Sequence, residues 1–589
     1  MDQSPLLGDS NYSEVALQGD SPSPNKGEKK YHRHSWRWFI LAMFIFCGIS
    51  NAMVMLSFSP IFGLSTEYFG PAFGGSSTPG TATAVNLLAT LFQIMYIPGT
   101  YKAAKVLKGN RIRDAVLQGM AYTFLGNTLR YFTANAYSQR DPFDESFETS
   151  TLNYILIFLG TILVAIAQPI FLNTPTLVAL VWFSVSEREL AMTLLTLNNA
   201  LGNAIGSILP SIMVPPLDPD VNHQDLRVNV SFLILVQFGA SLVGMLFAYN
   251  LFANQPPIPP SRAAEKLRED NLRAEVDPDD PGYTLMQWEF GVDAAKEMRD
   301  QQSELAQAAG DSATNAAAPP MEGQSALLRE QERPASGTGS GSGGREQNVY
   351  ESYGPKVRED MWLVVQNGEY LKLVFGLSMF IGTMNSGATL LGQLPTYMEP
   401  QNIGFIGFCL IVSGFLGSLA AGTLLGKTKK YNLILKAMYI LGAAAWAGFM
   451  LSCHDYGNAT FAPLLIAASM AGFFVIGSIP ATLQSAVEVT YPIPEEISVG
   501  LLFSAANTAA IPFTFIGQTL LANDLASREG MDNTGMRYPP YAIFSSVCVA
   551  LGMLAVVTFK GGQYNRLNLD VPPSPDHTPL RTASRGGEA

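Results

Sequence analysis

Amide side chains stand inside several long apolar stretches of this chain, where a polar group needs a specific partner. Those nearest the middle of a stretch are Asn51, Gln168, Asn385, Gln393 and Asn507. In a medium without water, an amide bonds either to a neighbouring helix or to a solute in a wet cavity. The five amides could therefore line a binding site for a small organic solute. Hydrogen bonding between helices is the alternative for each.

Two of these amides precede a proline closely. Pro169 follows Gln168, and Pro395 lies two residues after Gln393. A proline within a helix removes a backbone donor and leaves a carbonyl group of the preceding turn without its usual partner. Interrupted helices of this kind tend to line transport sites in membranes. The two glutamines are therefore the strongest substrate-binding candidates.

Charged groups are rare inside the apolar stretches. Arg130 lies within one of them, toward its end, where it could hold an anionic group, pair with a carboxylate or extend to the membrane interface. No Asp or Glu stands near the middle of any stretch, so no central proton-binding carboxylate is visible. Glu187, Arg113 and Glu488 lie at the ends of stretches, where we expect ion pairs that act as gates.

Groupings typical of catalysis are missing from the sequence. The five histidines and four cysteines show no metal-ligand spacing. Neither a nucleophile elbow nor a phosphate-binding glycine motif occurs. The sequence predicts no enzyme activity, no metal site and no cofactor.

The elements that must position these residues are membrane-spanning helices. Charged residues make up 14% of the 589 residues, against roughly 25% in soluble proteins. A bilayer-spanning helix needs about 20 apolar residues. Stretches of that kind recur twelve times, at 38–62, 82–107, 113–136, 151–172, 189–213, 231–253, 370–397, 403–426, 432–452, 461–486, 497–521 and 539–559.

The twelve stretches fall into two groups of six. They predict an all-α membrane protein with the major facilitator fold, in which two six-helix halves rock about a central site. The predicted parts are an N-terminal tail (1–36), a first half (37–253), a polar cytoplasmic linker (254–369), a second half (370–560) and a C-terminal tail (561–589). The expected partners are the lipid bilayer and a small-molecule substrate, not nucleic acid, and the chain is expected to be a monomer.

Basic residues and short motifs predict the orientation. Lysine and arginine gather before the first stretch, between the second and third, and after the eighth, which places both termini in the cytoplasm. Asn229 and Asn458 begin glycosylation sequons on the opposite side. Leu6 and Leu7 fit an acidic dileucine signal that a sorting adaptor could read. They favour a vacuolar or lysosomal membrane, with the plasma membrane as the alternative.

Short strings recur through both halves, including Ser50-Asn51-Ala52, Tyr96-Ile97-Pro98, Ala167-Gln168, Trp182-Phe183 and Tyr491-Pro492. In order and spacing they resemble the feline leukaemia virus subgroup C receptor-related family of major facilitator transporters. That resemblance implies transport of haem, choline, ethanolamine or pyridoxine. Other strings, Leu129-Arg130 among them, are similar to the lysosomal disrupted-in-renal-carcinoma branch of that family.

The resemblance also implies binding residues. Gln168 matches a glutamine that lies near the bound ammonium group in the choline-carrying members, and Asn507 replaces a second one. Met55 falls where those members carry a tryptophan, and Leu390 falls at or near their tyrosine. Because the two aromatic rings bind a quaternary ammonium by cation–π contact, their loss argues against choline here.

The sequence thus predicts a secondary transporter of a small organic solute that works by alternating access. A non-transporting receptor or sensor with the same fold is the alternative from another class. Within transporters, haem or a choline or ethanolamine carrier is the competing interpretation, and a neutral or weakly charged solute conflicts least with the polar residues available.

Overall fold

The computed structural model describes residues 34–107, 111–140, 147–215, 223–261, 264–265, 268, 362–394, 398–428, 430–453, 461–490, 495–528 and 540–561. The predicted sorting residues Leu6 and Leu7, the sequon residue Asn458 and Pro395 lie outside these ranges, as does most of the predicted linker.

Helices build both halves of the described chain. The first half contains α1 (Arg37–Ala52), α2 (Phe62–Phe69), η1 (Gly70–Phe73), α3 (Pro79–Ile94), α4 (Tyr96–Leu107), α5 (Ile112–Ser138), α6 (Phe147–Asn173), α7 (Pro175–Trp182), α8 (Val185–Thr196), α9 (Asn198–Met213) and α10 (His223–Asn250). The second half contains α15 (Gly368–Thr389), η4 (Leu391–Gln393), α16 (Pro400–Thr428), α17 (Tyr431–Ser452), α18 (Phe461–Gly477), α19 (Ile479–Thr490), α20 (Glu495–Arg528) and α21 (Pro540–Val557).

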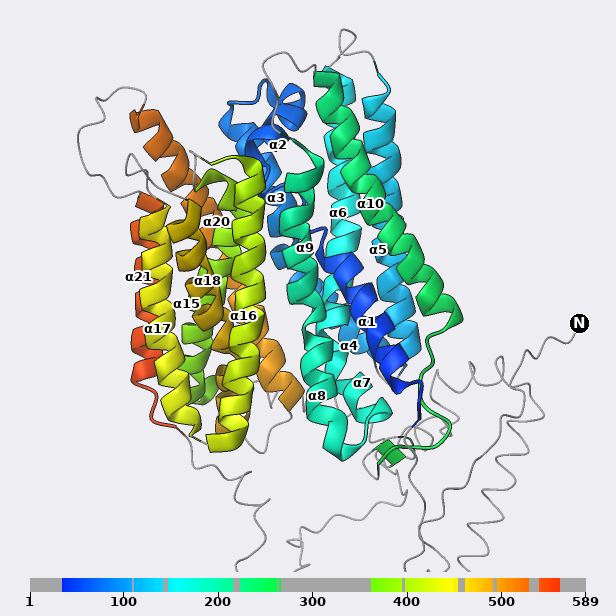
Figure 1. Ribbon diagram of the computed structural model, residues 1–589, viewed down its shortest axis with the longest axis vertical. Coiled ribbons are helices and arrows are strands. Elements are labelled where there is room, and N and C mark those ends of the chain that lie inside the picture. Colours follow the sequence, from blue (N-terminus) through cyan, green and yellow to red (C-terminus); the bar gives the residue numbers. More distant parts are fainter. Residues whose placement is uncertain are drawn as a thin grey trace, which may run out of the picture.

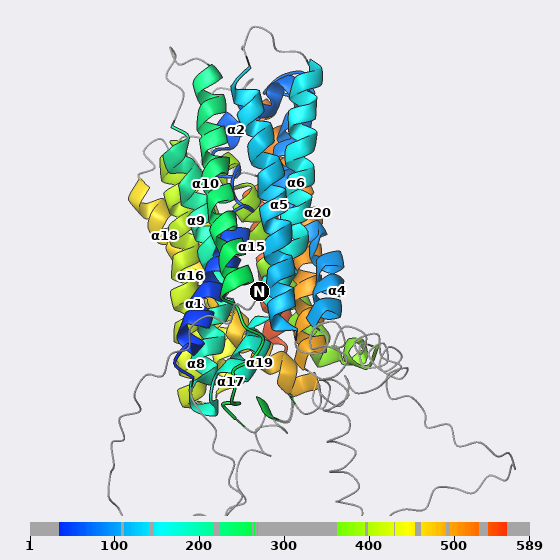
Figure 2. The ribbon, with the colours of Figure 1, turned by 90° about the vertical axis from the view of Figure 1, so that its right-hand side faces the viewer.

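The two halves stand side by side as separate bundles, with α9 and α16 lying along their boundary (Figure 1). Figure 2 shows α5, α6 and α10 together on the flank of the first half. We call the end where α1 begins and α21 ends the terminal face, and the end that carries α2 and η1 the loop face. Within the described residues, eight helical segments are long and apolar enough to cross a membrane, and α1 is a shorter apolar helix. Several remaining crossings combine two helical pieces, such as α8 with α9.

The first crossing departs from the continuous helix that was predicted over 38–62. Helix α1 ends at Ala52, and residues 53–61 are irregular but buried before α2 begins at Phe62. Pro60 disfavours helix at the residue before it and donates no backbone hydrogen bond. Side chains satisfy part of this backbone: the Ser57 hydroxyl donates to the Val54 carbonyl over 2.7 Å, and the Ser65 hydroxyl donates to the Phe58 carbonyl over 3.1 Å. Irregular backbone at membrane depth is tolerated when it is covered by protein in this way.

The predicted interruption after Gln168 is not found. Pro169 lies inside α6, which continues to Asn173. A Cβ on Gly99 of α4 would lie 2.7 Å from the Pro169 ring, so a glycine gives this proline room beside the neighbouring helix. At the other predicted interruption α15 does end, at Thr389, and Gln393 lies in the separate short turn η4.

Close helix packing in the second half depends on glycine. A Cβ on Gly417 of α16 would collide with the Phe473 carbonyl of α18, and one on Gly472 of α18 would collide with the Leu410 carbonyl of α16. Small residues let helix backbones approach closely where lipid supplies no hydrophobic drive for association. The α16–α18 contact is therefore fixed by the absence of side chains at these positions.

We expect Gly417→Ala to lower the apparent melting temperature of the detergent-solubilised protein, because the added methyl group overpacks the contact by about 1–3 kcal/mol. Gly422→Ala is the matched control in the same helix, since a Cβ there meets nothing within 4 Å. Equal melting temperatures for the two variants would contradict this account of the α16–α18 contact.

Candidate functional site

Gln168 and Asn199 form a polar pair between α6 and α9. The Gln168 Nε2 donates to the Asn199 Oδ1 over 3.0 Å. Gln168 is buried and Asn199 is half-buried. The bond uses the glutamine's donor and the asparagine's acceptor, so the Gln168 Oε1 and the Asn199 Nδ2 are left to bond other groups. The pair can therefore offer a ligand one acceptor and one donor.

The second half contributes Asn385 of α15 and Asn507 of α20, and both side chains are half-buried. Their helices pack closely, since a Cβ on Gly382 would lie 3.4 Å from the Ala506 carbonyl. The Asn507 Nδ2 donates to the Phe503 carbonyl of its own helix over 2.9 Å. This bond leaves the Asn507 Oδ1 as an acceptor.

Asn51, in contrast, ties helices of the first half together. Its Nδ2 donates to the Thr123 hydroxyl of α5 and to the Val164 carbonyl of α6, each over 2.9 Å. The side chain is 1% exposed, and within the described chain its Oδ1 has no hydrogen-bond partner. The Asn51 donor therefore bonds neighbouring helices, which is the alternative to substrate binding that the sequence left open.

Gln393 is also bonded to another helix. It is 9% exposed, and its Nε2 donates over 2.9 Å to the Asn86 Oδ1 of α3, which belongs to the opposite half. Asn51, Gln168 and Gln393 thus each donate to another helix. Gln168 differs in that its partner Asn199 is half-buried, and Asn385 and Asn507 are half-buried themselves, so these positions are the ones a solute can reach.

Arg130 lies at the centre of a buried polar network. The guanidinium Nη1 donates over 3.0 Å both to the Asn127 Oδ1 and to the Gln237 Oε1 of α10. The Gln237 Nε2 in turn donates over 2.7 Å to Ser57 in the irregular part of the first crossing. Arg130 also lies 5.9 Å from the centre of the Phe58 ring. At 1% exposure the side chain does not extend to the membrane interface, so that alternative is wrong.

The predicted gate residues of the first half have partners on the terminal face. Arg37 at the start of α1 forms a two-bond ion pair with Glu187 of α8, over 3.0 and 3.1 Å. Arg113 of α5 donates from its Nη2 to the Tyr249 carbonyl over 3.2 Å. Glu488 is 3% exposed in α19 of the second half. Gating by these residues remains a prediction, because the Glu187 and Arg113 contacts join helices of the same half.

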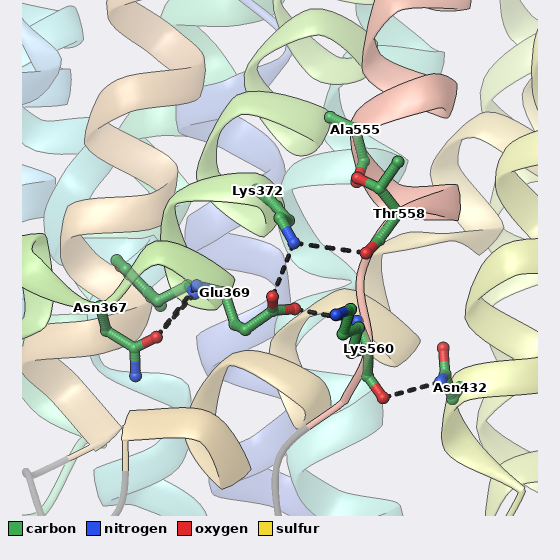
Figure 3. Close-up of polar contacts among 8 residues, drawn as sticks. Asn367, Glu369, Lys372, Asn432, Ala555, Thr558 and Lys560 are labelled. Carbon is green, nitrogen blue, oxygen red and sulfur yellow. Dashed lines mark hydrogen bonds and ion pairs between the residues drawn. The ribbon is translucent and has the colours of Figure 1, made fainter.

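A matching cluster closes the terminal face of the second half (Figure 3). The Lys372 Nζ lies 2.6 Å from the Glu369 Oε1 and donates to the Thr558 carbonyl over 3.3 Å. The Glu369 Oε2 accepts from the Lys560 backbone over 2.9 Å, and Asn432 of α17 donates to the Lys560 carbonyl over 3.4 Å. These bonds tie the ends of α15, α17 and α21 to one another.

Met55 and Leu390, at the positions where the resemblance implies aromatic rings, are buried in one apolar cluster. That cluster contains Val54 and Phe92 of the first half as well as Leu391 of the second. These positions therefore contribute to apolar contact between the halves.

The remaining site prediction with a described position is the glycosylation sequon at Asn229, which lies half-buried within α10. Glycosylation there and at Asn458 remains a prediction. The residues that sequence analysis missed, Asn86, Gln237 and Gln518, are amides within or beside apolar stretches. Their location within or beside an apolar stretch is the only feature of the sequence that could have identified them.

Comparison with known proteins identifies the family. The protein-family model described as Major Facilitator Superfamily matches residues 38–510 of this sequence. The chain belongs to the Major Facilitator Superfamily. Its curated relatives include the choline/ethanolamine transporter FLVCR1 of Mus terricolor, 24% identical over 84% of this chain and 71% of that protein. The choline/ethanolamine transporter FLVCR2 of Homo sapiens is 21% identical over 89% of this chain and 77% of its own length.

Solved structures agree on the fold of this facilitator. A partially occluded inward-open conformation of the xylose transporter XylE from E. coli gives a TM-score of 0.52 at 13% identity, covering 89% of this chain and 98% of that chain. The proton:xylose symporter XylE bound to 6-bromo-6-deoxy-D-glucose gives 0.54 at 12% identity, with 90% and 97% covered. At such identities the likeness shows the fold alone.

These findings confirm the predicted fold, the family resemblance and the multi-pass membrane character of this facilitator. They also confirm the prediction of a secondary transporter over a non-transporting receptor. The named relatives are transporters rather than enzymes.

Substitutions at Arg130 and Gln237 of this facilitator should have strongly coupled effects on stability. We expect Gln237→Leu to lower stability by about 1–3 kcal/mol, because it deprives a buried charge of an acceptor. Adding Arg130→Met should recover part of that loss, since the charge that needed the acceptor is then absent.

The measurement is the apparent melting temperature of each single variant and of the double variant in detergent. Asn250→Leu, an amide-to-apolar change at the exposed end of α10, is the control. Losses that simply add would show that Gln237 does not support the Arg130 charge.

Proposed function

We propose that this facilitator carries a small polar solute that donates hydrogen bonds, of the ethanolamine type rather than the choline type. The supporting observation is the set of uncharged acceptors presented by both halves. The Gln168 Oε1 and the Asn507 Oδ1 remain after each side chain has used its own donor. An ammonium or hydroxyl group that carries hydrogen can donate to such oxygens.

A quaternary ammonium cannot donate a hydrogen bond and depends on aromatic faces instead. The two positions where choline-carrying relatives are expected to supply rings hold Met55 and Leu390, and both are buried in the apolar cluster. Each missing cation–π contact costs about 2 kcal/mol or more when desolvated. The relatives FLVCR1 and FLVCR2 are named as transporters of both choline and ethanolamine. This chain would favour ethanolamine of the two.

Gln168, Asn199, Asn385 and Asn507 form the proposed substrate site. Both halves contribute, as a carrier that alternates access about a central site requires. The free Asn199 Nδ2 would bond an acceptor on the solute, such as a hydroxyl oxygen. Pyridoxine, which also carries hydroxyl groups, is the competing neutral solute.

We expect Gln168→Leu to reduce labelled ethanolamine uptake by at least about tenfold, because one buried hydrogen bond to a charged group is worth about 1.5–3 kcal/mol. Uptake is measured with purified protein in lipid vesicles, beside choline, pyridoxine and haem. Asn250→Leu should transport normally, and both variants should keep the wild-type melting temperature.

Preferential transport of choline would overturn the proposed selectivity. Preferential transport of pyridoxine would replace the amine with a neutral solute at the same amides. Unchanged ethanolamine uptake by Gln168→Leu would remove that residue from the site.

We further propose that the terminal face lies in the cytoplasm and that the protein resides in the vacuolar or lysosomal membrane. The basic segments near the termini and the Leu6-Leu7 motif support this placement. An adaptor that reads the motif would select the compartment.

Replacing Leu6 and Leu7 by Ala is expected to move a fluorescent fusion from the vacuolar or lysosomal membrane to the plasma membrane, because the adaptor loses its contact. Replacing Val15 and Leu17 in the same tail by Ala is the matched control and should change nothing. Microscopy that finds both variants in the wild-type location would contradict sorting by this motif.

A further inference from the structure

A chain of side-chain hydrogen bonds joins the two halves near the loop face. The Gln393 Nε2 donates to the Asn86 Oδ1 over 2.9 Å, and the Asn86 Nδ2 donates to the Gln518 Oε1 over 3.1 Å. The Gln518 Nε2 then donates to the Thr83 hydroxyl over 2.7 Å. We call Thr83, Asn86, Gln393 and Gln518 the amide latch.

Asn86 is the centre of this latch. It lies in α3 of the first half and uses its acceptor toward η4 and its donor toward α20, both in the second half. It is 2% exposed, and its two partners are each 9% exposed. One asparagine thereby holds the ends of two crossings of the opposite half at once.

Backbone contact accompanies the latch. The Ser207 hydroxyl of α9 donates to the Gly404 carbonyl of α16 over 3.2 Å. A Cβ on Gly392 would collide with the Ser59 carbonyl and lie 2.8 Å from the Phe62 Cβ, so η4 touches the first crossing directly. The loop face is therefore closed between the halves in this conformation.

Two ion pairs among the described residues of the terminal face lie within single halves. Arg37 pairs with Glu187 inside the first half, and Lys372 pairs with Glu369 inside the second. These bonds would survive a separation of the halves at that face, whereas the amide latch would not survive a separation at the loop face.

We propose that the amide latch sets the balance between the two access states by holding the loop face closed at rest. Neutral amides suit this task because each hydrogen bond between them is only modestly stronger than a bond to water, so several together favour the closed face and still allow it to open. A ligand or substitution shifts a two-state equilibrium only by its different effect on the two states. Loss of the latch weakens only the closed loop face, so the population open to that face rises.

The test measures opening at the loop face by chemical labelling. The reporter is Ser59→Cys in full-length protein whose Cys47, Cys409, Cys453 and Cys548 are replaced by Ala. Ser59 is 4% exposed behind the closed face, so a polar maleimide should label it slowly in lipid nanodiscs. We expect Asn86→Leu to speed labelling about tenfold, and Gln393→Leu and Gln518→Leu to speed it by smaller factors.

Thr90→Val is the matched control. Thr90 also lies in α3 and donates to the Asn86 carbonyl of its own helix over 2.8 Å, so its loss removes a hydrogen bond that does not cross between the halves. Its labelling rate should match that of the reporter protein. The two glutamine variants keep the test decisive if Asn86→Leu does not fold.

Faster labelling in folded latch variants supports the proposal. Labelling within twofold of the Thr90→Val rate in every folded latch variant overturns it. Because no substrate is used, the outcome does not depend on whether ethanolamine is the solute.

Discussion

The lack of water within a membrane constrains this structure most strongly, because each buried polar group must form its hydrogen bonds with another part of the protein. The irregular segment 53–61 shows the consequence most clearly. Its Ser57 accepts a bond from Gln237, and Gln237 accepts one from Arg130. A buried charge, an amide and an unwound crossing thus support one another, and none would be stable in lipid alone.

Hydrogen bonds within the halves and hydrogen bonds between them serve different purposes. Asn51 holds three helices of one half together, and the pairs Arg37–Glu187 and Glu369–Lys372 secure helix ends within a half. Such bonds keep each half rigid while the two halves move. The Gln393–Asn86 bond, in contrast, crosses the boundary and has to break and re-form during a cycle that alternates access.

Hydropathy was enough to predict the twelve crossings, their division into halves and the membrane character, because the bilayer fixes the length and polarity of each span. It could not show which way an amide points, since that depends on helix rotation and on which crossings are neighbours. For that reason Asn51, Gln168 and Gln393 were grouped as substrate-binding candidates, although each of their donors bonds another helix. The break after Ala52 was missed because the residues that follow it are apolar enough to continue a helix. The roles of Asn86 and Gln518 became apparent only from the structure, which shows the hydrogen bond between their side chains.

The boundary between α9 and α16 is built from unusually short side chains. Ser207 and Ser211 face Gly404 and Gly407, where an added methyl group would meet the serine hydroxyls or the α9 backbone. Opening of the loop face therefore has to part or slide the two backbones at Gly404 and Gly407, and a longer side chain at either glycine would hinder their return to close contact.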